Sequence, residues 1–156
     1  MTQSSAVFSA RSAASKFLPA NQTSEAFVLE RLIARNPSSD WVSELETRFR
    51  DFNNLAAGWD GYGGQPIDFH CARFTEQVLE QLSRSDLPAP SLVPLSNGTL
   101  QFEWHLNDFD LEVEVHGPLE MSCYRNDLLS GEEEERLLRA DLLHLRKWLN
   151  DMAARN

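Results

Sequence analysis

The feature that most constrains the fold is a run of alternating apolar and polar residues between positions 92 and 124. Side chains alternate between the two faces of a sheet, so this period predicts strands with one buried face. Turn signals divide the run: Asn97-Gly98 is a strong two-residue hairpin signal and Asn107-Asp108 a weaker one. We therefore predict four strands, at Leu92–Ser96, Thr99–Leu106, Phe109–Val115 and Leu119–Tyr124.

These turns fix which residues face each other across neighbouring strands. With a further three-residue turn at 116–118, every apolar residue falls on one face. Pro94 lacks a backbone donor, so we expect the first strand at an edge of the sheet. The expected apolar pairs are Leu95 with Leu100, Val93 with Phe102, Leu106 with Phe109, Trp104 with Leu111, Phe102 with Val113, Val115 with Leu119, Val113 with Met121, and Leu111 with Cys123.

The opposite face of the predicted sheet is rich in carboxylates. Like charges directly across strands destabilise a sheet mildly, so such a face requires dilution by solvent or a partner of opposite charge. The expected neighbours on this face are Glu103 and Glu112, Gln101 and Glu114, His105 and Asp110, and Glu114 and Glu120.

Three interpretations of this acidic face are open. It is an ordinary solvated surface, a surface that binds a basic protein, or a metal site made from His105, His116 and the carboxylates. Carboxylates and imidazoles on one face are common, and no dense ligand spacing singles out a metal centre. We therefore predict neither a metal site nor a cofactor, and Glu103, Glu112, Glu114 and Glu120 are candidate binding residues.

A loop rich in glycine and aromatic residues precedes the strands, with the sequence Trp59-Asp60-Gly61-Tyr62-Gly63-Gly64-Gln65-Pro66-Ile67. Its glycines permit positive φ angles, whereas large aromatic residues are foreign to a flexible linker. We predict an ordered, tightly turned loop whose two rings pack on neighbouring structure. Glycines before a helix can also hold a phosphate. A preceding helix and the lack of a following Lys favour a structural connection, with Gly58 capping that helix.

Helical periodicity is found on both sides of this loop. Apolar residues recur every three or four positions in residues 23–36, from Ser38 to Gly58 and from Ile67 to Arg84, which predicts three helices. Cys71 falls on the apolar stripe of the third, so we expect its thiol to be buried and unreactive.

A last helix is predicted from Ser130 onward. Glu133 stands three residues later, which is the spacing of a capping box. Leu137, Leu143 and Trp148 widen the apolar stripe beyond what one sheet face needs, so this helix is either deeply packed or a second surface for a partner. The stripe itself consists of Leu138, Leu142, Leu145, Leu149 and Met152.

Length and composition set outer bounds. The 156 residues allow one domain with a core but not two, and we divide them into a loosely ordered tail at 1–22 and a domain at 23–156. Residues 1–24 contain Arg11 and Lys16 but no Asp or Glu, a composition typical of a tail or of an address signal. The two cysteines are too few for a disulfide framework, so we expect a cytoplasmic protein.

The net charge of −10 bears on the choice of partner. It disfavours direct binding to nucleic acid or to anionic membranes and favours a basic protein. The sequence leaves open whether the chain forms a homo-oligomer.

The central motifs resemble a widespread family of small bacterial proteins. That family has a W-D-G-Y-G-A-x-P loop, a D-G-G-L-Q-L-E-W hairpin and an L-E-V-E-I strand, which correspond here to 59–66, 97–104 and 111–115. The match covers about the middle half of the chain and departs at Gly64, where the family usually has Ala, and at Asn97-Gly98-Thr99. The family has no established activity. The resemblance thus implies a bacterial cytoplasmic origin and a fold, and assigns no catalytic residue.

The expected architecture is one α+β domain, in which N-terminal helices, a helix packed on a four-stranded antiparallel meander and a C-terminal helix follow one another. The first hypothesis for function is an acidic, non-enzymatic protein-binding module of the antitoxin, immunity or inhibitor type, which neutralises or regulates a basic protein. The second is a small hydrolase or transferase with a site at the loop that uses Asp60, Tyr62 and a nearby His. We assign no catalytic residue, and Trp59, Asp60 and Tyr62 are candidate binding residues of the loop. The third is a secretion or folding chaperone.

Overall fold

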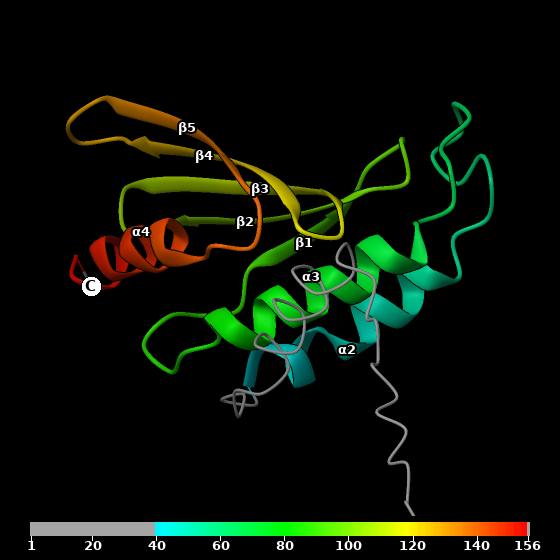
Figure 1. Cartoon of the computed structure of the whole chain (residues 1–156), viewed down its shortest axis with the longest axis horizontal. Helices are drawn as coiled ribbons and strands as arrows, with labels where there is room; N and C mark the ends of the chain where they lie inside the picture. The colour runs from blue at the N-terminus through cyan, green and yellow to red at the C-terminus, as the bar shows by residue number, and fades with distance from the viewer. Residues whose placement is uncertain (1–39, 156) are drawn as a thin grey trace, which may run out of the picture.

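Residues 40–155 are described by a computed structural model, in which one antiparallel sheet carries its helices on a single side (Figure 1). The predicted tail at 1–22 and the predicted helix at 23–36 lie outside the described residues. The sheet of the described part has five strands, one more than the sequence predicts, and each pairs with its neighbour in the chain. The strands are β1 (Ser91–Pro94), β2 (Leu100–Leu106), β3 (Phe109–Gly117), β4 (Glu120–Asp127) and β5 (Glu132–Leu138), and the helices are α2 (Asp40–Asn53), α3 (Phe69–Leu82) and α4 (Leu143–Ala153).

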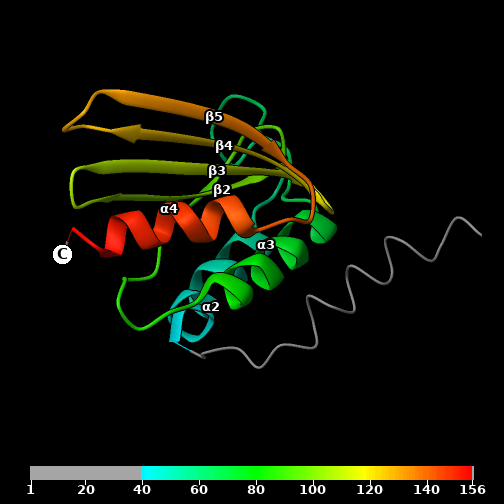
Figure 2. The same ribbon diagram turned by 60° about the vertical axis from the view of Figure 1, so that its left-hand side comes forward.

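The helices form a layer beneath the sheet and leave its other face open (Figures 1 and 2). Helix α2 packs beside α3, and α4 runs along the sheet on the same side. The core lies between the two layers and includes the fully buried residues Val78, Leu79, Phe102, Leu111, Val113 and Leu145. No helix in residues 40–155 has the length and apolar character needed to cross a membrane.

The helix boundaries near the loop follow from local hydrogen bonds. The N-cap of α3 is Asp68, whose Oδ1 accepts a hydrogen bond from the backbone N–H of Cys71 at 2.9 Å. Helix α2 ends at Asn53, so the expectation that it continues to a cap at Gly58 is wrong. Successive turns replace its last part, because the N–H of Leu55 donates to the carbonyl of Phe52.

The pairing of β2 with β3 matches the predicted register at every residue, including Glu103 opposite Glu112. Asn107 and Asp108 both have positive φ angles, as the tightest hairpin turn requires. The two-residue turn predicted between these strands is therefore confirmed.

The pairing of β1 with β2 differs from the prediction by one residue. Leu92, and not Val93, lies opposite Phe102. The cause is a longer turn: the N–H of Leu95 donates to the carbonyl of Thr99, so three residues and not two connect the strands. A one-residue slip exchanges the two faces, and Leu92 is accordingly buried. As predicted, β1 is an edge strand.

The pairing of β3 with β4 differs from the prediction by two residues. Val115 lies opposite Met121, and a bulge separates it from the pair formed by Gly117 and Glu120. Because the shift is even, the apolar residues keep to the buried face. The expected contact between Glu114 and Glu120 is wrong, since the strands run on to a turn of only two residues.

The helix predicted from Ser130 is also wrong, because residues 132–138 form β5 and helix α4 begins only at Leu143. The carboxylate of Asp127 accepts the N–H groups of Leu129 and Ser130, and Gly131 takes a positive φ of 71°. These contacts reverse the chain and return it along β4. Seven residue pairs with β4 outweigh the helix propensity of the glutamates.

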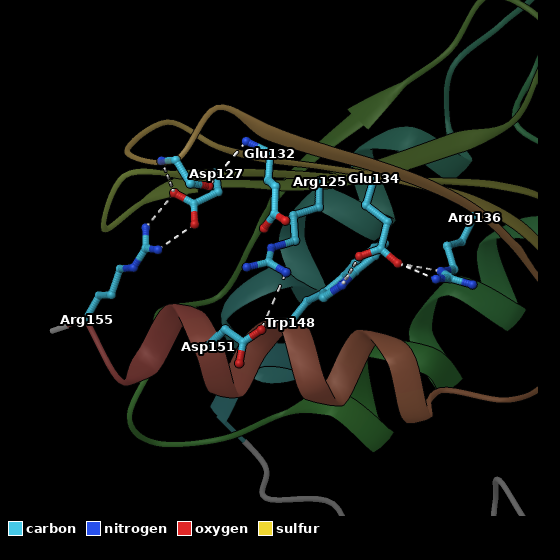
Figure 3. A network of polar contacts seen from close by, with 9 residues as sticks. Arg125, Asp127, Glu132, Glu134, Arg136, Trp148, Asp151 and Arg155 are labelled. Carbon is cyan, nitrogen blue, oxygen red and sulfur yellow. Dashed lines mark hydrogen bonds and ion pairs between the residues drawn. The ribbon is translucent and has the colours of Figure 1, made fainter.

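Polar contacts join this end of the sheet to α4 (Figure 3). The indole Nε1 of Trp148 donates to Glu134 at 3.2 Å, and the Arg155 guanidinium forms an ion pair with Asp127. Of the three residues expected to widen the apolar stripe, Trp148 is buried at 1% exposure, whereas Leu137 and Leu143 are 80% and 68% exposed. All five residues of the predicted stripe are buried, although Leu138 belongs to β5 and not to the helix.

Candidate functional site: the acidic face of the sheet

The open face of the sheet carries the outward side chains of β2 to β5, which we call the acidic face. Side chains alternate along a strand, so the pairing fixes which residues belong to it. None of the five described strands places a Lys or Arg at an outward position. Its carboxylates are Glu103, Asp110, Glu112, Glu114, Glu120, Glu133 and Glu135.

Outward residues cross the sheet in rows, because pairing brings them opposite one another. In the central row Glu103 lies opposite Glu112, Glu112 opposite Tyr124, and Tyr124 opposite Glu135. A row of this kind carries unbalanced negative charge across four strands. The flanking rows are Gln101, Glu114, Ser122 and Leu137, and His105, Asp110, Asn126 and Glu133.

Tyr124 occupies the centre of the acidic face. Partial burial raises the pKa of its hydroxyl, and the negative charges of Glu133, Glu112 and Asp110 raise it further. The phenol therefore stays protonated and offers a neutral ring and a hydrogen-bond donor among carboxylates.

A shallow hollow of about 90 Å³ opens beside this tyrosine. Small-molecule sites usually measure about 300–1,000 Å³, so the hollow is too small for a substrate. It is large enough to admit the cationic head of a single side chain. Its lining consists of Gln101, Glu112, Glu114, Ser122, Cys123, Tyr124 and Glu135.

Two histidines at the margins are the only basic side chains on the acidic face of the described strands. Nδ1 of His105 lies 2.7 Å from the carboxylate of Asp110, and this hydrogen bond is the main reason that the pKa of His105 is raised. Nε2 of His116 lies 2.8 Å from the hydroxyl of Ser122. Within residues 40–155, no three metal-binding side chains are placed to hold a metal ion.

The aromatic and glycine-rich loop is ordered by its own hydrogen bonds. The Nε1 of Trp59 donates to the carbonyl of Gln65 at 2.9 Å, and the N–H of Gly58 donates to the carbonyl of Gly64 at 2.7 Å. Trp59 is half-buried, whereas the side chain of Tyr62 is 96% exposed. The expectation that both rings pack on neighbouring structure is therefore wrong for Tyr62.

Asp60 holds the loop together and is poorly suited to acid–base catalysis. Its Oδ1 accepts the backbone N–H groups of Tyr62 and Gly64, both at 2.8 Å, and these bonds lower the pKa of the carboxyl. A base whose pKa lies far below neutrality transfers protons inefficiently at pH 7. A Cβ on Gly64 would lie 2.8 Å from Cγ of Asp60, so the glycine leaves room for this carboxylate.

Apart from Glu120, the sequence does not predict the residues that β4 and β5 contribute to the acidic face. The sequence predicts a helix over Glu133 and Glu135, and it pairs Cys123 with Leu111, whereas the structure pairs Cys123 with Val113 and so brings Tyr124 opposite Glu112. The glutamate run shows no alternation of polar and apolar residues, so no local pattern marks it as a strand.

Comparison of the chain with protein-family models, with curated proteins and with solved structures finds no match.

Proposed function

We propose that this chain is an acidic, non-enzymatic protein-binding module whose acidic face engages a basic protein and thereby neutralises or regulates it. The observation that carries the proposal is the row from Glu103 to Glu135, which crosses four strands with no Lys or Arg beside it. An antiparallel sheet commonly leaves one face in water, and a solvated face usually mixes both charge signs. The single sign here favours a partner of opposite charge.

A surface charge of this kind acts mainly on the rate at which the two proteins associate. A surface of one charge sign draws oppositely charged proteins and speeds their association, and salt weakens the effect. Each exposed ion pair contributes only about 0.2–1 kcal/mol, so affinity must come from several pairs together. The spread of the carboxylates over β2 to β5 allows a partner to form several at once.

The second hypothesis, a hydrolase or transferase at the loop, has less support. Asp60 is engaged by the backbone of its own loop, and its low pKa argues against a general acid or base. Tyr62 is 96% exposed, so its side chain projects into solvent and is not enclosed. Catalysis there would lack the means to exclude water.

The proposal is tested with arginine nonapeptide as a defined basic probe. Glu112→Gln combined with Glu114→Gln removes two charges from the acidic face, and Glu44→Gln combined with Glu46→Gln removes two from α2 in the helix layer. At low salt we expect the first pair to weaken binding roughly 3- to 10-fold, as two exposed ion pairs would. The second pair should leave the affinity nearly unchanged. An equal loss of affinity in both double variants would mean that the peptide responds to the net charge of the protein and not to this face.

A further inference from the structure

Tyr62 is held in an unusual position, since a rigid loop presents its aromatic ring entirely to solvent. The ring is 96% exposed, whereas the backbone N–H of the same residue is fixed by Asp60 at 2.8 Å. Gly61 and Gly63 on either side have positive φ angles of 79° and 100°. The backbone at this point is therefore specified by the sequence, while the ring makes no contribution to packing.

The side chains that hold the loop in shape, Trp59 and Asp60, are different from the exposed side chain of Tyr62. Trp59 closes the loop through its indole N–H and Asp60 through its carboxylate. A fully exposed tyrosine is not needed for either contact. Tyrosine is enriched at the energetic centres of protein interfaces, because its rigid ring gives a large contact area at a low entropic cost.

The loop borders the acidic face. The N–H of Gln65 donates to the carbonyl of Ser96 in the turn between β1 and β2, at 2.8 Å. In the same turn the hydroxyl of Thr99 lies 3.2 Å from Oε1 of Glu114, a member of the acidic face. One short chain of contacts thus links the loop to Glu114, and Figure 1 shows the loop beside the turn that joins β1 and β2.

A second exposed aromatic residue stands at this end. Phe69 opens α3 and is 64% exposed, and the preceding residue, Asp68, donates its N–H to the carbonyl of Gly98 in the same turn. In the described residues, the other large exposed apolar side chains are leucines. The aromatic surface is therefore concentrated beside the acidic face.

We propose that Tyr62 is the aromatic anchor of the partner surface and that its ring stacks on an arginine side chain of the same basic partner whose other cations meet the acidic face. This inference rests on the proposed function. An aromatic face attracts a cation, and the planar, weakly hydrated guanidinium stacks on it better than an ammonium group. A rigid loop improves such a contact because little motion is lost on binding. The structure thus favours an arginine-rich partner over a lysine-rich one.

The test uses arginine nonapeptide and lysine nonapeptide, each of which spans about 30 Å when extended and so reaches from the loop onto the sheet. Tyr62→Ala should weaken binding of the arginine peptide roughly 2- to 30-fold, the range of a cation–π contact. Binding of the lysine peptide should change much less. Tyr62→Phe, which keeps the ring, should retain the parent affinity for both.

The matched control is Leu129→Ala. It removes another exposed apolar side chain, from the turn between β4 and β5. It should leave both affinities unchanged. An unchanged arginine affinity in Tyr62→Ala, or an equal loss for both peptides, would overturn the assignment of Tyr62.

The failures of the two proposals are distinguishable. If Glu112→Gln with Glu114→Gln weakens binding and Tyr62→Ala does not, the binding role of the acidic face is supported and the anchor role of Tyr62 is contradicted. If the glutamate pair has no effect on either peptide, or if neither peptide binds the parent protein at low salt, the proposed function fails and the anchor fails with it.

Discussion

The indole N–H of Trp148 in α4 donates a hydrogen bond to the carboxylate of Glu134 in β5, at 3.2 Å. This contact joins two elements that the sequence assigns to one continuous helix. It also places the ring against the sheet, where 1% of the residue remains exposed. Arg136 pairs with the same carboxylate, and together these hydrogen bonds lower the pKa of Glu134.

Replacement of Trp148 tests this part of the fold. We expect Trp148→Ala to lower the free energy of unfolding by about 3–5 kcal/mol, as truncation of a buried aromatic residue does. Trp148→Phe keeps most of the apolar contact and loses the hydrogen bond, so a smaller loss of about 1–2 kcal/mol is expected. Urea denaturation of the three proteins gives both values. Equal, negligible losses would contradict the position of α4 against β5.

Substitution of two other tryptophans compares the contributions of the loop and of the core to stability. Trp41 is buried and donates its indole N–H to the carbonyl of Leu87, whereas Trp59 is half-buried and donates its indole N–H to the carbonyl of Gln65 within the loop. We expect Trp41→Ala to cost about 3–5 kcal/mol and Trp59→Ala about 1–2 kcal/mol. Thermal or denaturant melts measure the difference. A larger loss from Trp59→Ala would show that the loop is part of the core.

The acidic face should respond to pH through His105. The pKa of its imidazole is raised chiefly by the hydrogen bond to Asp110, so the protonated form is favoured in the folded protein. Its contribution to stability is fully present below the ordinary pKa of about 6.5 and is lost as pH rises through the raised pKa. Proton NMR should give a higher pKa for His105 in the parent protein than for the same residue in the Asp110→Asn variant.

The same titration should alter binding. Protonated His105 adds a positive charge to the acidic face, so the affinity for arginine nonapeptide should increase as pH rises through the pKa of this residue. His105→Gln should remove that part of the pH dependence. A pH profile identical in both proteins would assign the effect to another group.

The cysteines offer a test of burial that is independent of binding. Burial raises the pKa of the Cys123 thiol to about 12 and raises that of Cys71, whose sulfur lies 3.0 Å from the carbonyl of Val115. A buried, protonated thiol is a poor nucleophile. At pH 8 we expect a maleimide reagent to label neither residue in the folded protein and both in denaturant. Rapid labelling of either one in the native state would contradict its place in the core.

The sequence predicts well what depends on local pattern. Alternation of apolar and polar residues identifies the paired strands β2 and β3, and the positive φ angles at Asn107 and Asp108 agree with the turn between them. Longer-range choices were missed. Strand β5 has no alternating pattern and exists because β4 provides backbone partners, so its glutamates could not be placed on the acidic face in advance.

The candidate site was predictable to the same extent. Glu103 and Glu112 face each other as the turn at 107–108 predicts, because that hairpin is local. Tyr124 joins their row only through a two-residue shift between β3 and β4, and the bulge after Val115 leaves no clear signal in the sequence. The two backbone N–H groups that bind the carboxylate of Asp60 depend on the fold of the loop, so the sequence alone does not distinguish a structural role for this residue from a chemical one.

The most direct test of the acidic face is the salt dependence of the association rate with arginine nonapeptide. Steering by charge fades over a Debye length of about 8 Å at physiological ionic strength, so the parent protein should associate much more slowly at high salt than at low salt. Glu112→Gln with Glu114→Gln should associate more slowly at low salt and show a flatter dependence, while Glu44→Gln with Glu46→Gln should follow the parent. An association rate and a salt dependence that are the same for the parent protein and for the acidic-face variant would contradict a binding role for this face.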